Sequence, residues 1–208
     1  MSTPRSAGDA PPRDAAEHDH LVERFNAAVR HPGEHGGVGQ LARLLDALAQ
    51  SEGERWIVDG NARLSMTALV RYCYPQPEIH VVAAEYGDAA HRRGWLRLDR
   101  ALGADDYGSL LGSVDDWAKR NRTLDQVLDA YGPPSVVFGD PGPRTAKTLG
   151  YGSEDREAPL LAFHFGDGKG AAQARLLAFR SGDDLFEAYM GFTPHGETVA
   201  DEKEGRQL

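Results

Sequence analysis

The stretch TLDQVLDAYGPPSVVF, residues 123–138, decides the fold. Thr123 and Gln126 match a capping box, in which each of two side chains bonds to the backbone N–H of the other residue. The apolar residues that follow recur at helical spacing and form one stripe: Leu124, Val127, Leu128 and Tyr131. Gly132 and the two prolines after it favour the end of a helix. The stretch therefore predicts a short helix over residues 124–131.

Short strand-like segments follow this helix, and they occupy residues 135–138, 147–151, 160–165 and 174–180. The third segment alternates most regularly, with its phenylalanines on one face and His164 on the other. The loop GDGKG at residues 166–170 favours a hairpin between the last two segments. Residues 186–192 predict one more strand, with a short helix as the alternative. The sum is a helix packed on an antiparallel meander.

The pattern T-x-x-Q-V-x-x-x-x-G-x-P is present here as Thr123, Gln126, Val127, Gly132 and Pro134. Followed by a meander, it resembles the helix-plus-sheet module of the β-lactamase-inhibitor proteins and the BamE-type lipoproteins. The resemblance covers residues 123–192, about a third of the chain. It implies a module that binds other proteins and performs no chemistry of its own. The chain departs from those families because it lacks both the paired cysteines of the inhibitors and the lipidated cysteine of the lipoproteins.

The N-terminal half begins with helical patterns. Apolar stripes within residues 21–29 and 41–48 predict two helices. The connector at residues 32–39 contains four glycines, so the pair is expected to form an αα-hairpin.

The rest of the N-terminal half predicts mixed structure. Residues 55–58 read as a strand and residues 65–73 as a helix. Residues 78–86 are apolar on both faces, which is typical of a central strand, and residues 95–98 are expected to pair with them. Residues 105–120 predict a helix that two internal glycines weaken.

These segments together predict an α+β fold, with N-terminal helices followed by a mostly antiparallel sheet and a short helix packed on it. Four regions are expected along the chain. Residues 1–17 form a disordered tail, residues 18–120 a helical and α+β N-terminal part, residues 121–200 the helix with its meander, and residues 201–208 a polar tail. Whether the two larger parts share one sheet is open at this point.

The composition limits which classes of partner and which cellular compartment are expected. The chain has 208 residues and a net charge of −9, which disfavours nucleic acid and suits a basic protein partner. The single cysteine, Cys73, cannot form an intrachain disulfide, so a reducing compartment is expected. Residues 1–20 contain no apolar signal-peptide core, and no apolar run is long enough to span a membrane. We therefore expect a cytoplasmic protein with no membrane contact.

Catalytic and metal-binding motifs are weak. The string His31-Pro32-Gly33-Glu34-His35 matches the H-x-x-E-H pattern of inverted zinc peptidases, which needs both histidines on one helix face. The proline and glycine inside it disfavour a helix, so the string is interpreted as a loop. Cys73 lies on an apolar stripe and is interpreted as a buried hydrophobe. No metal or other cofactor is expected.

Two sets of residues remain as candidates for a functional site. His164 and His195 could converge with Glu187 in a sheet-lined pocket, although a structural or solvated histidine is the more common case. The tryptophans Trp56, Trp95 and Trp117 are candidate interface anchors, with burial in the core as the alternative.

The sequence leads to two functional hypotheses. The favoured one is an acidic protein-binding module, such as an immunity or inhibitor-type protein that occludes a basic partner. The alternative is a small enzyme or ligand-binding domain that uses His164 and His195. The identity of the partner and the oligomeric state stay open.

Overall fold

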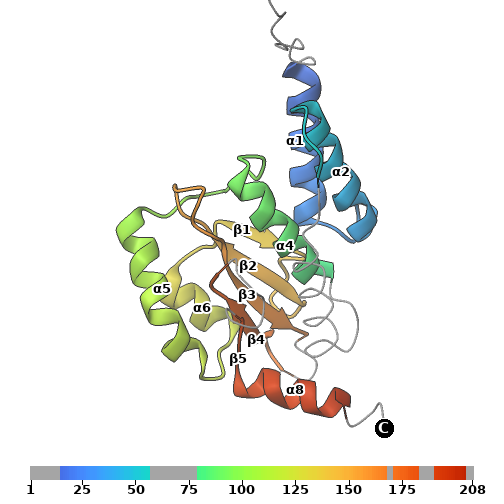
Figure 1. Cartoon of the computed structure of the whole chain (residues 1–208). Helices are drawn as coiled ribbons and strands as arrows, with labels where there is room; N and C mark the ends of the chain where they lie inside the picture. Colours follow the sequence, from blue (N-terminus) through green and yellow to red (C-terminus); the bar gives the residue numbers. More distant parts are fainter. Residues whose placement is uncertain (1–14, 57–78, 168–170, 183–189, 205–208) are drawn as a thin grey trace, which may run out of the picture.

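Five strands pair consecutively into one antiparallel sheet of order β1-β2-β3-β4-β5 (Figure 1). They are β1 (Val136–Phe138), β2 (Lys147–Tyr151), β3 (Leu161–Gly166), β4 (Arg175–Arg180) and β5 (Met190–Phe192). The structure is a computed structural model, and it describes residues 15–56, 79–167, 171–182 and 190–204. The predicted meander and the predicted α+β class are confirmed.

The short helix at the centre of the sequence forms as predicted. It is α6 (Leu124–Tyr131), and its capping box is complete. The N–H of Gln126 donates to Thr123 Oγ1 at 3.4 Å, and the N–H of Thr123 donates to Gln126 Oε1 at 3.1 Å. Gly132 ends the helix with a φ of 73°, which glycine adopts without strain.

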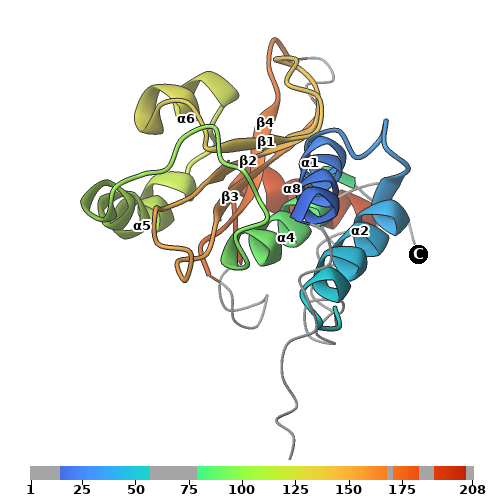
Figure 2. The same ribbon diagram turned by 90° about the horizontal axis from the view of Figure 1, so that it is seen from above.

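Helices α5 (Ala104–Ala118) and α6 cover one face of the sheet, as Figure 2 shows. The predicted helix over residues 105–120 is thus confirmed. The core on this side contains Tyr107, Leu110, Val114 and Val127 from the helices, packed against Leu149, Tyr151, Leu161, Phe163 and Phe165 from the strands. The face that carries the phenylalanines of β3 is therefore the α5–α6 face.

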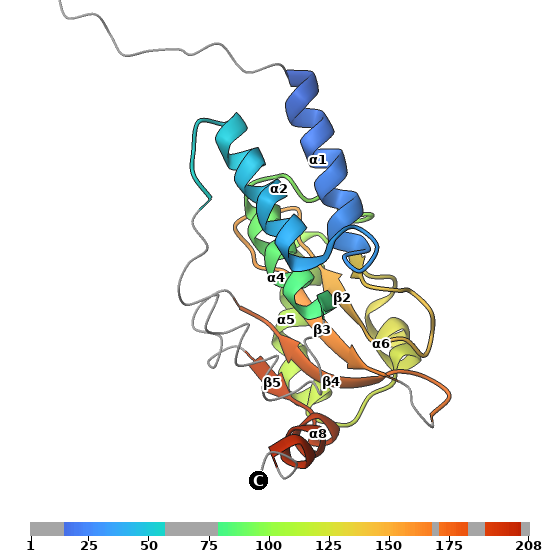
Figure 3. The same cartoon turned by 90° about the vertical axis from the view of Figure 1, so that its right-hand side faces the viewer.

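The other face is covered by α4 (Ile79–Arg92), with α1 (Ala15–Arg30) and α2 (Gly37–Ser51) packed beyond it (Figures 1 and 2). Helices α1 and α2 form the predicted αα-hairpin (Figure 3). Their buried residues share one core with α4 and with Val136, Phe138 and Leu160. All five strands come from the C-terminal half, so the N-terminal half contributes helices to a common core within the described residues.

Helix α4 overturns one prediction. Residues 78–86 were predicted to be a central strand paired with residues 95–98, but residues 79–92 are helical and residues 95–98 are irregular. A short run that is apolar on both faces does not distinguish a buried strand from a buried helix. Small residues let this helix approach the sheet closely, since a Cβ added to Gly87 would lie 2.6 Å from the Phe138 ring.

The helices near the two ends of the chain include residues that were predicted to be tails. Helix α1 begins at Ala15, inside the predicted tail, and helix α8 (Pro194–Glu204), which was not predicted, extends into the predicted polar tail. Helix α8 packs on β4 at the end of the sheet far from α1 (Figure 3). In the predicted strand at residues 55–58, Arg55 and Trp56 are irregular. The remainder of that strand and the predicted helix at residues 65–73 lie outside the described residues.

Candidate functional site

A line of polar side chains is buried between α4 and the sheet. His80 of α4, Thr148 of β2 and His164 of β3 are 2%, 0% and 0% exposed. The Nδ1 atoms of both histidines lie 2.8 Å from Thr148 Oγ1. One hydroxyl therefore links two imidazoles that come from opposite sides of a helix–sheet interface.

The register of the sheet places these groups together. Thr148 is the cross-strand partner of His164, and Ala178 of β4 is its partner on the other side. Because successive side chains of a strand point to opposite faces, His164 lies on the α4 face and the phenylalanines beside it lie on the other. Gly150 and Ala162, also a cross-strand pair, leave room on this face for the helix.

Burial controls the charge of His164. Its pKa lies well below the usual value, first because it is buried and then because His80 and Arg180 are close. His164 is thus a neutral imidazole at ordinary pH. Its Nε2 atom is buried and has no hydrogen-bond partner.

A buried ion cluster lies beside this line. Arg180 Nε is 2.8 Å from Glu85 Oε1, and Arg180 Nη1 is 3.4 Å from Asp88 Oδ2. Asp88 also pairs with Arg92 at 3.1 Å and accepts the N–H of Leu160 at 2.7 Å. Burial raises the pKa of Glu85, and Arg180 acts in the opposite direction. The cluster ties α4 to β4.

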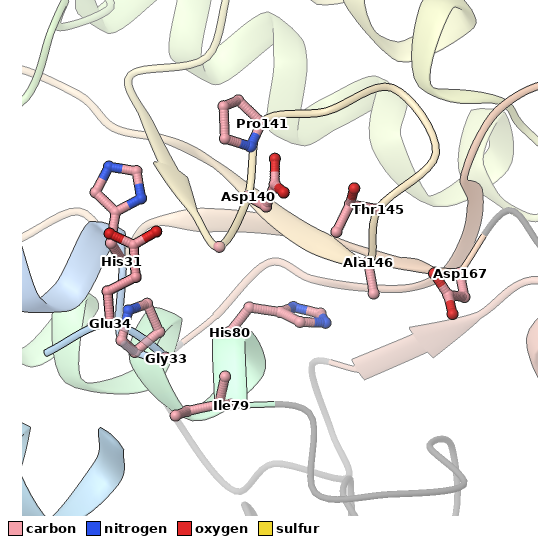
Figure 4. A pocket seen from close by; sticks show the side chains of 12 residues that line it. His31, Gly33, Glu34, Ile79, His80, Asp140, Pro141, Thr145, Ala146 and Asp167 are labelled. Atoms are coloured by element: carbon pink, nitrogen blue, oxygen red, sulfur yellow. The ribbon is translucent and has the colours of Figure 1, made fainter. Parts of the chain in front are cut away.

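A cavity of about 550 Å³ opens at the N-terminal end of α4 (Figure 4). Its polar lining comes from four separate segments of the chain. They supply His31 and Glu34 from the turn after α1, His80 from α4, Asp140 and Thr145 from the β1–β2 loop, and Asp167 from the end of β3. We call this cavity the α4 pocket.

The α4 pocket has an acidic rim. Glu34, Asp140 and Asp167 are exposed, whereas His80 is almost fully buried at the base. In Figure 4 the three carboxylates stand apart on separate segments, with Glu34 and Asp167 on opposite sides of the His80 ring. Lys147 is buried nearby, and its Nζ donates to the Gly142 carbonyl. Burial lowers the pKa of Lys147, and Asp140 opposes this effect.

The carboxylates of the pocket do not form a metal site. Among the described residues, no three His, Cys, Asp or Glu side chains come close enough to hold a metal ion. Three exposed carboxylates from separate segments give the rim of the cavity a negative charge. The H-x-x-E-H string contributes to this pocket without forming a helix, because residues 31–36 are a turn, as the sequence predicts.

The structure separates the histidines that the sequence singled out. His164 is bonded to Thr148 beneath α4, whereas His195 lies in the first turn of α8. The N–H of His195 donates to Asn121 Oδ1 at 2.8 Å, and burial followed by Arg175 lowers the pKa of its imidazole. No contact within the described residues joins the two rings. Glu187 lies outside those residues.

The three tryptophans occupy different environments. Trp95 is 1% exposed, and its Nε1 donates to Glu52 at 2.7 Å, so it is a core residue. Trp56 is partly buried beside it, with ring centroids 6.3 Å apart. Trp117 is partly buried between Tyr131, at 4.9 Å, and the guanidinium of Arg122, at 4.2 Å. Trp56 and Trp117 thus keep some exposed surface.

Sequence reasoning missed His80, Asp140 and Asp167. His80 stands in the run that was interpreted as a strand, and that reading hid a stripe of small and polar residues at helical spacing: His80, Ala84, Gly87, Asp88 and His91. This stripe was the available signal for a helix with a polar buried face. Asp140 and Asp167 follow separate strands, and no local pattern connects them.

No family model, curated protein or solved structure matches this chain. Each described helix is too short or too polar to cross a membrane.

Proposed function

We propose that this chain is a binding protein for a basic protein partner and that the α4 pocket accepts a lysine or arginine side chain of that partner. The observation that carries the proposal is that Glu34, Asp140 and Asp167, three carboxylates from separate segments, line one cavity. Charge-assisted hydrogen bonds between such groups and a cation are about twice as strong as neutral ones.

The surface supports recognition by charge. Within the described ranges, Val38 is the only large apolar side chain that is exposed, at 37%. A partner that docks on this surface therefore contacts polar and charged groups instead of an apolar patch. The net charge of −9 would accelerate association with a basic protein and make the rate depend on salt.

An immunity or inhibitor-type protein is the form of this function that we favour. Such a protein works by covering a basic functional surface, and it needs no catalytic group of its own. The resemblance of residues 123–192 to protein-binding modules points the same way. A cytoplasmic location, suggested by the single cysteine, is part of the proposal.

The alternative, a small enzyme that uses His164 and His195, has less support. Catalysis requires groups that reach a substrate. His164 is fully buried, and it bonds to Thr148, which separates it from the α4 pocket lined by His80.

Isothermal titration at low salt tests the proposal, with acetyl-arginine amide as the probe. The triple variant Glu34→Gln, Asp140→Asn and Asp167→Asn removes the acidic rim. The control variant Glu157→Gln, Asp116→Asn and Asp129→Asn makes the same charge change at exposed residues outside the pocket lining. We expect the first variant to weaken binding at least about tenfold and the control by much less. Equal losses in the two variants would contradict the proposed site, and so would a wild-type chain that does not bind.

A further inference from the structure

Lys147 is a buried lysine that holds the loop between β1 and β2. It is the first residue of β2, and it is 1% exposed. Its Nζ donates to the carbonyl of Gly142, which also accepts the N–H of Thr145 at 3.2 Å. A hydrogen bond from an ammonium group is about twice as strong as one between neutral groups. Lys147 therefore fixes the position of the Gly142 carbonyl.

Gly142 connects this anchor to the α4 pocket. The N–H of Gly142 donates to Asp140 Oδ1 at 2.7 Å. The loop is tight at this point, since a Cβ added to Gly142 would lie 3.0 Å from Thr145 Oγ1 and 3.1 Å from Asp140 Oδ1. Asp140 and Thr145 both line the α4 pocket. These two polar pocket residues are thus bonded to Gly142, whose carbonyl Lys147 holds.

Lys147 itself does not line the pocket. It is the cross-strand partner of Phe165, so the two side chains share one face of the sheet. Phe165 belongs to the core beneath α5 and α6, on the face opposite to α4. Apart from the long-range effect of its charge, Lys147 can therefore influence a ligand in the α4 pocket only through the loop.

We propose that Lys147 is a positioning residue for the α4 pocket and that it acts through Gly142 to hold the Asp140 carboxylate at the rim. This inference rests on the proposed function, in which that carboxylate binds the cation of a basic residue. Asp140 is exposed, so without these contacts its side chain would sample several rotamers. Ordering it when the ligand binds would then cost conformational entropy. The buried lysine removes that cost in advance.

Backbone dynamics of the ligand-free chain test the anchor. Lys147→Met retains the apolar part of the side chain and removes the ammonium group. We expect the ¹H–¹⁵N heteronuclear nuclear Overhauser effect of the Gly142 and Thr145 amides to fall in this variant, because the loop becomes more mobile. Lys119→Met is the charge-matched control, since it removes an exposed ammonium group beside Asp116, and it should leave these values unchanged. Values that stay unchanged in Lys147→Met overturn the inference.

Binding of acetyl-arginine amide tests the consequence, because positioning and charge predict opposite signs. Removing a positive charge by itself strengthens the binding of a cation, and Lys119→Met should show this small effect. If Lys147 positions Asp140, Lys147→Met should instead weaken binding about fivefold, as the loss of about one hydrogen bond does. Thermal unfolding confirms that both variants fold. Binding to Lys147→Met that is as tight as to Lys119→Met overturns the inference.

The double variant Lys147→Met with Asp140→Asn shows whether the effect passes through Asp140. Once the carboxylate is gone, Lys147→Met should cause little further loss of affinity. An equal further loss would show a general disturbance of the pocket, and it would overturn the positioning role.

The outcomes separate this inference from the proposed function. If the wild type binds acetyl-arginine amide and Lys147→Met binds it as tightly, only the inference fails. If the wild type does not bind the probe, the proposed function fails, and the positioning role fails with it even where the amide dynamics show that Lys147 anchors the loop.

Discussion

Arg180 of β4 and Glu85 of α4 form an ion pair of 2.8 Å whose side chains are 5% and 13% exposed. Removing one partner of a buried pair leaves an uncompensated charge, which costs about 3–5 kcal/mol. We therefore expect Arg180→Met and Glu85→Met each to lower the free energy of unfolding by about 3 kcal/mol. Urea denaturation measures both values.

The double variant Arg180→Met with Glu85→Met checks the pairing. Because the two residues are in contact, the double variant should lose less stability than the two single losses added together. If the loss of unfolding free energy in the double variant equalled the sum of the two single losses, each residue would be stabilised by its other neighbours and not by the pair. Asp88 keeps Arg92 and the Leu160 N–H as partners in every variant, but it loses its 3.4 Å contact with Arg180 in the two variants that lack this residue.

Gly87→Ala tests the close approach of α4 to the sheet. Alanine favours a helix over glycine by about 1 kcal/mol, but here its Cβ would lie 2.6 Å from the Phe138 ring. We expect a net destabilisation of about 1–3 kcal/mol by thermal or urea unfolding. Gly108→Ala in α5 is the matched control, since nothing lies within 4 Å of its added Cβ, and it should stabilise the chain. Stabilisation by both substitutions would contradict the packing of α4.

Stability should fall below pH 6.5 through His164. Its pKa in the folded chain lies well below the usual 6.5, so its contribution is complete above pH 6.5 and is lost as the pH falls. One buried group of this kind changes the free energy of unfolding by up to about 1.4 kcal/mol per pH unit. His164→Asn keeps an amide that can bond Thr148 and removes the titration.

The measurement is urea unfolding of the wild type and of His164→Asn between pH 5 and pH 7.5. The difference between the two chains at each pH cancels the other titrating groups, including His91, whose pKa burial also lowers. His195→Asn should reduce the dependence of the unfolding free energy on pH by less than His164→Asn does, because His195 is partly exposed. Parallel curves for the wild type and His164→Asn would refute the account of His164.

Local signals predicted α6 and the strands after it, but they did not predict α8. Three local signals specify α6 and the strands after it: a capping box, a glycine followed by two prolines, and a regular alternation around His164. Each signal acts over only a few residues, so it can be recognised in the sequence. Helix α4 was missed because the choice between strand and helix for an apolar run depends on what covers it. Here Gly150, Ala162 and Ala178 on the sheet leave space for a helix.

The pocket was not predictable for a different reason. Glu34, His80, Asp140 and Asp167 are far apart in sequence, and they line one cavity only in the folded chain. The prediction of His164 as a pocket residue assumed that its face of the strand was open. The structure covers that face with α4, and His80 becomes the histidine that reaches a cavity.

The central claim is that the α4 pocket is the binding site for a basic residue. Its most direct test is ¹H–¹⁵N shift mapping of the labelled full chain during titration with acetyl-arginine methylamide. We predict that the perturbed amides cluster at residues 31–34, 79–80, 139–146 and 167. Perturbations centred on the exposed aspartates of α5 and α6, or no saturable shift anywhere, would contradict the claim.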